Sequence, residues 1–166
     1  EPSSIDFPIV GVGASAGGLD AFAELLSGVP VNTPLALVLV QHLDPTHESA
    51  LVDLLARTTR MPVVEVKHGT RIEPAHVYVI PPNKDMALLH GRLQLLAPVA
   101  PRGLRLSIDY FFRSLALDQR TAGIGVLLSG LGSDGTLGLQ AIKAQAGAVF
   151  VQDPASARFD SMPRSA

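Results

Sequence analysis

The chain has 166 residues, of which 47% are hydrophobic and only 17% are charged, and its formal net charge is −2. This composition is that of a globular domain with a sizeable core, it excludes a disordered chain, and without a basic stripe it argues against a nucleic-acid partner. Cysteine is absent, which excludes disulfides and thiolate metal sites, and no apolar run approaches the length of a membrane span.

Strands and helices are predicted to alternate along most of the chain. Short apolar runs bounded by glycine or turn residues predict buried strands, and apolar residues spaced i, i+3, i+4 and i+7 predict helices. In chain order, we expect a strand at 7–14, a helix at 18–27, a strand at 35–40, a helix from 44 to about 60, strands at 62–66 and 77–80, a hairpin of 86–89 and 93–96, a helix from 107, a strand at 124–128, a helix from about 136 and a strand at 148–151. Asp44 is expected to cap the second helix, followed by Pro45, and Ser107 the third.

This order of elements predicts an α/β fold. We expect a doubly wound, mostly parallel sheet with helices on both faces and one antiparallel hairpin, whose turn is His90-Gly91. Neither an internal repeat nor a linker is evident, so residues 1–166 are expected to form a single domain. Right-handed crossovers would bring the turns between strands and helices to one edge of the sheet.

The turn after the first strand, Gly-Val-Gly-Ala-Ser-Ala-Gly-Gly at 11–18, has two interpretations. Its central part fits the G-x-S-x-G nucleophile elbow, which would expose Ser15 for acyl transfer. It also fits the dinucleotide fingerprint, which would make the turn a pyrophosphate cradle. Dinucleotide binding calls for an acidic residue at the end of the second strand, but that strand ends in Gln41-His42, which favours the nucleophile.

Three residue types that a serine esterase needs follow three predicted parallel strands. Ser15 follows the first strand, His42 the second, and Asp134 the strand at 124–128. The histidine would act as the base and the carboxylate would orient its ring, so we expect His42 Nε2 near Ser15 Oγ and Asp134 on the other ring nitrogen. Each residue also has a purely structural interpretation: a tight turn, a hydrogen-bonded strand end, and a cap for the helix that begins near Thr136.

Backbone amides are the expected oxyanion donors. One is the amide of Ala16, which follows the candidate nucleophile, and a second is expected from the turn Gly130-Leu131-Gly132.

Other polar residues give weaker signals. A metal site of His42, Asp44 and His47 is disfavoured because their spacing matches no helix-based ligand pair, and neither a metal nor a cofactor is expected. Solvent exposure is expected for three further histidines, His68, His76 and His90. Arg102 and Arg105 could face an acidic partner, although solvated surface charge is the more common role.

Taken together, these motifs resemble the CheB-type chemotaxis methylesterase domain. The segments that carry the resemblance are 10–18, 41–45, 77–83, 129–135 and 159–164, so it covers nearly the whole chain. It implies a cytoplasmic enzyme, without cofactor, that hydrolyses glutamate γ-methyl esters on the helices of methyl-accepting chemoreceptors and deamidates certain receptor glutamines. The resemblance gives Ser15, His42 and Asp134 the roles of nucleophile, base and orienting carboxylate. Leu131 falls where the family often has a methionine whose amide faces the site.

The resemblance also includes departures. Ala16 replaces a common threonine. We also expect a domain that is short at its C-terminus and that is not preceded by a receiver domain. The segments 44–48 and 107–114 are similar to the subgroup fused to a CheR-like methyltransferase, often with sensor modules. Met162 and Pro163 are expected to line the cleft. The alternative function is a catalytically weak regulatory or interaction module of a chemotaxis-like signalling protein.

Overall fold

A six-stranded parallel sheet forms the centre of the molecule. The computed structural model describes residues 5–42, 48–98, 100–101 and 104–166. The sheet has the order β3-β5-β2-β1-β8-β9, and every neighbouring pair is parallel. Its strands are β1 (Ile9–Ala14), β2 (Ala36–Gln41), β3 (Val63–Glu65), β5 (His76–Val79), β8 (Gly123–Leu127) and β9 (Ala148–Val151). The predicted parallel sheet is therefore confirmed.

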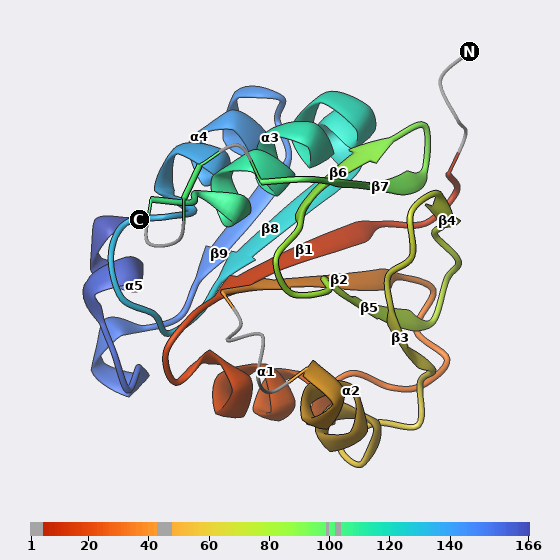
Figure 1. The fold of residues 1–166 in the computed structure, drawn as a ribbon, viewed down its shortest axis with the longest axis horizontal. Helices are drawn as coiled ribbons and strands as arrows, with labels where there is room; N and C mark the ends of the chain where they lie inside the picture. The colour runs from red at the N-terminus through yellow and green to blue at the C-terminus, as the bar shows by residue number, and fades with distance from the viewer. Residues whose placement is uncertain (1–4, 43–47, 99, 102–103) are drawn as a thin grey trace.

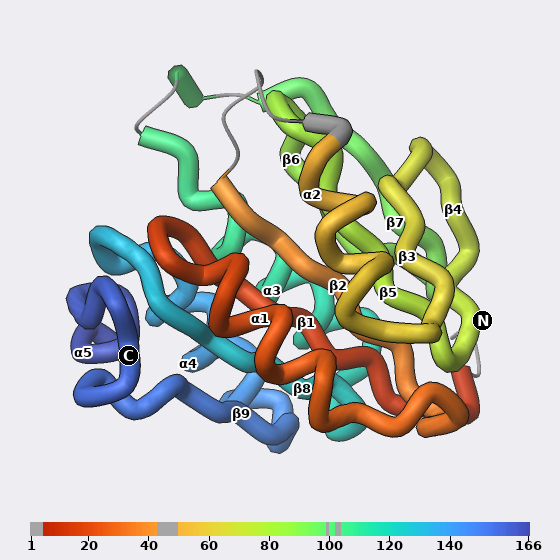
Figure 2. Tube along the Cα trace, turned by 90° about the horizontal axis from the view of Figure 1, so that it is seen from below, coloured from red at the N-terminus to blue at the C-terminus, as the bar shows by residue number. Residues whose placement is uncertain are grey.

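Helices cover both faces of this sheet, as predicted. Figure 1 shows α1 and α2 on one face and α3 and α4 on the other, and Figure 2 shows α1 and α2 side by side over the strands. The bounds of the helices are α1 (Gly18–Ser27), α2 (Glu48–Ala56), α3 (Ser107–Gln119) and α4 (Thr136–Ala144). Asp44 and Pro45, the predicted start of α2, lie outside the described residues. None of the helices in the described part of the chain is long and apolar enough to cross a membrane.

Alternate residues of β1 face two separate cores. Val10 and Val12 pack with α1 and α2, whereas Ile9 packs with α3 and α4. The two glycines of this strand face α3. A Cβ on Gly13 would collide with Ile108, and one on Gly11 would lie 3.0 Å from Leu115 Cδ2. Gly11 and Gly13 of the glycine-rich segment therefore allow α3 to approach the sheet closely.

A second, smaller sheet holds the predicted hairpin. It joins β4 (Thr70–Arg71), β6 (Asp85–Leu89) and β7 (Arg92–Leu96) in the order β4-β7-β6, all antiparallel. His90 and Gly91 have φ values of 49° and 71°, as a two-residue type I′ turn requires. The hairpin pairs with β4 and not with the parallel sheet. Because β4 has only two residues, it carries no alternation by which the sequence could reveal it.

The described part of the chain also contains short helical elements. A 3₁₀ helix at Arg120–Ala122 follows α3, another at Pro154–Ser156 follows β9, and the short helix α5 occupies Ser161–Ser165. In Figure 1, α5 lies beside the carboxyl ends of the strands.

Candidate active site

The predicted site residues meet at the carboxyl ends of three neighbouring strands. Ser15 directly follows β1, His42 directly follows β2, and the loop that contains Asp134 joins β8 to α4. One pocket of about 450 Å³ brings all three together. Its lining residues are Ser15, His42, Arg105, Leu106, Leu131, Gly132, Ser133 and Asp134.

Ser15 is fixed by the loop after β8. Its amide donates to the carbonyl of Ser129 at 3.0 Å, and its carbonyl accepts from the amide of Gly18 at 2.9 Å. Gly17 adopts a left-handed φ of 73°, which glycine favours, and so turns the chain into α1. The hydroxyl accepts a hydrogen bond of 2.8 Å from the amide of Leu131. A serine hydroxyl and a loop amide therefore face each other at the pocket, although Ser15 is only 9% exposed.

His42 and Asp134 form a close pair. The Nε2 atom of His42 donates to Asp134 Oδ2 at 2.8 Å, and the His42 side chain is 34% exposed whereas that of Asp134 is 6% exposed. The prediction that Nε2 faces Ser15 is therefore wrong, because this nitrogen is engaged by the carboxylate. Either ring nitrogen can meet a carboxylate, and which one does depends on the rotamer, which the sequence does not specify. Within the described residues, Nδ1 is the nitrogen left for Ser15.

Asp134 also caps a helix, but not the predicted one. Its Oδ2 accepts from the amide of Ile108 at 3.0 Å and its Oδ1 from the amide of Asp109 at 2.9 Å. These amides belong to the first turn of α3, where orphan donors favour an anion. Ser107, the predicted cap of this helix, is instead its first residue, and its hydroxyl donates to Asp85 Oδ1 at 3.2 Å. Asp134, which is distant in sequence, therefore provides the hydrogen-bond acceptors that Ser107 was predicted to provide.

Asp109 completes a reciprocal arrangement that sequence reasoning missed. Its Oδ1 accepts from the amides of Gly135 at 2.9 Å and Gly138 at 2.7 Å, at the start of α4. Each of the two helices thus receives its cap from a carboxylate at the start of the other or just before it. Burial raises the pKa of the Asp109 carboxyl above its ordinary value, opposed by the amide of Gly138, and the charge of Asp134 raises it further. The available signal was an acidic residue inside the apolar stripe of a predicted helix.

Of the two predicted oxyanion donors, the amide of Leu131 faces the pocket, whereas Ala16 does not line it. The amide of Leu131 points at the Ser15 hydroxyl. Ala16 is not among the residues that line the pocket, and its carbonyl accepts from the hydroxyl of Ser129 at 2.9 Å.

The C-terminal segment supports the pocket from behind. The amide of Gly130 donates to the carbonyl of Phe159 at 3.0 Å, and the amide of Met162 donates to the carbonyl of Gly130 at 3.1 Å. Met162 is fully buried and Pro163 is buried, and neither lines the pocket. The expectation that they line the cleft is therefore wrong; their burial anchors the loop that presents Leu131.

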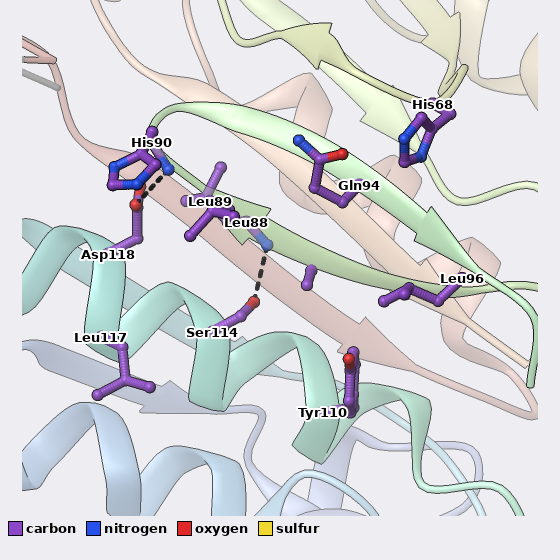
Figure 3. Close-up of a pocket in the computed structure, with 11 residues that line it drawn as sticks. His68, Leu88, Leu89, His90, Gln94, Leu96, Tyr110, Ser114, Leu117 and Asp118 are labelled. Carbon is purple, nitrogen blue, oxygen red and sulfur yellow. Dashed lines mark hydrogen bonds between the residues drawn. The ribbon is translucent and has the colours of Figure 1, made fainter. Parts of the chain in front are cut away.

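A second cavity lies away from these residues, between the hairpin and α3. It has a volume of about 630 Å³, and Leu89, Leu96 and Leu117 contribute its apolar wall (Figure 3). His68 and His90 line it and are exposed, as predicted, and the amide of Leu95 donates to His68 Nδ1 at 3.0 Å.

The remaining polar residues singled out in the sequence are only partly within the described residues. His76 is half-buried and stacks on Tyr78, with ring centroids 5.9 Å apart, so its predicted exposure is only partial. Asp44 and His47 of the disfavoured metal site, and Arg102, lie outside the described residues. Within the described residues, no cluster of three or more potential metal ligands occurs.

Known proteins resemble this chain over most of its length. Residues 10–166 match the family model described as CheB methylesterase. The protein-glutamate methylesterase/protein-glutamine glutaminase of Photorhabdus laumondii is 37% identical over 162 residues, which are 95% of this chain and 46% of that protein. The chain thus spans about half the length of the curated relatives it matches. An uncharacterized 104.1 kDa protein of Rhodobacter capsulatus is 47% identical over 116 residues, which are 70% of this chain and 12% of that protein.

A solved structure matches as well. The crystal structure of the Thermotoga maritima CheB methylesterase catalytic domain superposes with a TM-score of 0.87 at 27% identity, covering 97% of this chain and 87% of that one.

Proposed function

Because the chain belongs to the CheB methylesterase family, we propose that it hydrolyses glutamate γ-methyl esters, with Ser15 as the nucleophile, His42 as the base and Asp134 as the orienting carboxylate. One observation carries this proposal: a serine hydroxyl, a histidine–carboxylate pair and a loop amide share one pocket. Relatives named protein-glutamate methylesterase/protein-glutamine glutaminase support both the substrate class and a second activity, deamidation of glutamine.

The proposed reaction has two halves. Ser15 Oγ attacks the ester carbonyl while the Nδ1 atom of His42 takes the hydroxyl proton, and the tetrahedral intermediate collapses as the proton passes to the departing methoxide, which leaves as methanol. Water, activated by His42, then attacks the glutamyl ester of Ser15 and releases the free γ-carboxylate. Asp134 holds Nε2 and stabilises the imidazolium that forms in each half, because its carboxylate lies 2.8 Å from that nitrogen.

Backbone amides are proposed to stabilise the oxyanion. The amide of Leu131 donates to Ser15 Oγ in the absence of substrate and is close enough to turn to the oxygen of a bound ester. The amide of Ala16 follows the nucleophile and is the second proposed donor. Because position 16 is alanine, its contribution is limited to the backbone.

The proposal also covers where the domain acts and with which partners. We infer that residues 1–166 act as one catalytic domain in the cytoplasm, on the helices of methyl-accepting chemoreceptors, together with a CheR-like methyltransferase and sensor modules, fused or associated. The 47% identity over 116 residues to a segment of a 104.1 kDa protein supports a large parent protein, since that identity exceeds the 37% of the methylesterase of Photorhabdus laumondii, which matches over 162 residues. The alternative is a regulatory module with weak catalysis.

Methanol release from a peptide that carries a glutamate γ-methyl ester tests the proposal. We expect Ser15→Ala to lower the rate at least about 1,000-fold, because the nucleophile is lost. Ser27→Ala, at an exposed position of α1, is the matched control and should keep the wild-type rate. Absence of release by the wild type would favour the regulatory module, and undiminished release by Ser15→Ala would remove the nucleophile assignment.

A further inference from the structure

Arg105 is a fixed cation at the rim of the candidate active site. It lines the same pocket as Ser15, His42 and Asp134. Its Nε donates to the carbonyl of Ala100 at 2.9 Å, and its Nη1 donates to Asn83 Oδ1 at 2.8 Å. A carbonyl five residues earlier in the chain and an asparagine after β5 therefore hold the guanidinium in place.

The way Arg105 is held leaves one edge of its guanidinium available. An arginine has five N–H donors in a planar fork, and the two bonds to Ala100 and Asn83 engage Nε and Nη1. Among the described residues, no group accepts from Nη2 and no carboxylate forms an ion pair with Arg105. A fork that is already oriented loses little conformational entropy when it binds a carboxylate.

Asn83 is well suited to orient this side chain. It has a φ of 57°, in the left-handed region that asparagine tolerates better than most residues, and it follows Pro81-Pro82 after β5. Its neutral side-chain oxygen accepts from Nη1 without cancelling the charge. An aspartate at this position would hold Arg105 equally well and would neutralise it.

We propose that Arg105 selects substrates that carry a second carboxylate beside the reacting glutamate ester, by binding that carboxylate at the rim of the pocket. This inference rests on the proposed function, since it assigns a substrate preference to the same site. The ester itself is uncharged, so the charge of Arg105 is available for a neighbouring acidic side chain. On a helical substrate, side chains one turn before or after the ester lie on the same face.

The test compares two helical peptides that carry the same glutamate methyl ester. One has glutamate one turn before and one turn after the ester, and the other has alanine at both positions. We expect the wild type to prefer the acidic peptide about three- to tenfold in kcat/KM at low salt, mainly through KM, because the contact is a charge-assisted hydrogen bond at a half-exposed site.

Two variants remove the free charge in different ways. Arg105→Gln deletes the guanidinium, and Asn83→Asp places a carboxylate against it. Both should bring the preference ratio close to one, and Arg105→Lys should keep part of the preference. Arg71→Gln is the control, because Arg71 is exposed on β4, at the end of the molecule remote from the carboxyl ends of the strands (Figure 1); it should keep the wild-type ratio.

The outcomes separate this inference from the proposed function. A wild-type ratio near one, or an unchanged ratio in Arg105→Gln, overturns the role of Arg105. Turnover of the alanine peptide, and its loss in Ser15→Ala, tests the esterase on its own. If no peptide is turned over, fluorescence anisotropy measures the affinities of the acidic and the alanine peptide for the wild type and for Arg105→Gln. The ratio of these affinities then tests the role of Arg105 independently of the esterase activity.

Discussion

Gly130 is the residue at which the candidate site tolerates no side chain. A Cβ built there would lie 2.5 Å from Ser15 Oγ and 2.8 Å from the sulfur of Met162. Both neighbours are buried, so neither can move aside without disturbing the pocket or the loop behind it. The backbone conformation is not the constraint, since the φ of Gly130 is not positive. The glycine is required for close approach.

We predict that Gly130→Ala lowers methanol release at least about tenfold, because the added methyl group displaces the Ser15 hydroxyl, and destabilises the fold by about 1–3 kcal/mol through overpacking. Gly28→Ala is the matched control: Gly28 has a φ of −89°, and the nearest atom to its added Cβ lies at 3.6 Å. The control should keep its activity and stability, measured by thermal unfolding. Wild-type turnover in Gly130→Ala would show that the loop can shift freely.

Asp109 links the protonation of a buried group to stability. Because burial raises the pKa of its carboxyl, the folded state prefers the neutral form more than the unfolded chain does. This contribution to stability is complete below the unfolded value near 3.8 and is lost as the pH rises through the folded pKa. Both helix amides bind the same oxygen, Oδ1, which an asparagine also possesses.

We therefore predict that Asp109→Asn gains on the wild type as the pH rises. The difference in melting temperature between the two proteins should be smallest near about pH 3, where both side chains are neutral, and should shift in favour of Asp109→Asn towards about pH 7. Thermal unfolding across this range measures it, with Asp53→Asn, at an exposed position of α2, as the matched comparison. A shift in the opposite direction would mean that the two amides outweigh burial.

The five-residue helix α5 supports the loop of the candidate active site. Met162 from this helix is fully buried against Gly130, and Ser161 Oγ accepts from the amide of Gly132 at 3.1 Å. The helix thus holds both sides of Leu131, whose amide faces Ser15.

We predict that Met162→Ala lowers the free energy of unfolding by about 2–5 kcal/mol, because a large buried side chain is lost, and lowers turnover because the Leu131 amide loses its support. Arg164→Ala is the control in the same helix: Arg164 is exposed, and its partner Asp160 is exposed too. The control should change neither quantity appreciably. Reduced stability with unchanged kcat would show that α5 supports the fold but not the site.

The elements that the sequence revealed are those with a strong apolar pattern. The central strands of the parallel sheet were predictable as continuous apolar runs, because both of their faces are buried. The helix α3 was predictable from the stripe of Phe111, Phe112 and Leu115 at helical spacing. The short elements β4 and α5 were not, since two and five residues are too few to show a period. The cap of α3 was also missed, because Asp134 lies 26 residues from Ile108 in sequence and the contact is tertiary.

At the scale of the whole molecule, the order of the strands assembles the site. Because β2, β1 and β8 are neighbours, Ser15, His42 and the loop with Asp134 share one edge. The rule that crossovers are right-handed predicts the shared edge but not the order of the strands. It also does not predict how the imidazole ring of His42 is oriented. The residue types of the candidate site were therefore predictable, whereas the nitrogen that His42 presents and the supporting roles of Asp109 and Asn83 required the three-dimensional arrangement.

The double engagement of Asp134 affects how relatives of this protein should be judged. Its carboxylate caps α3 as well as contacting His42, so selection for folding alone is sufficient to retain it. A relative that had lost its chemistry would keep this aspartate, whereas Ser15 and His42 would be free to drift. An intact aspartate is therefore poor evidence of an active enzyme in a newly sequenced member, and the serine and the histidine are the positions to inspect.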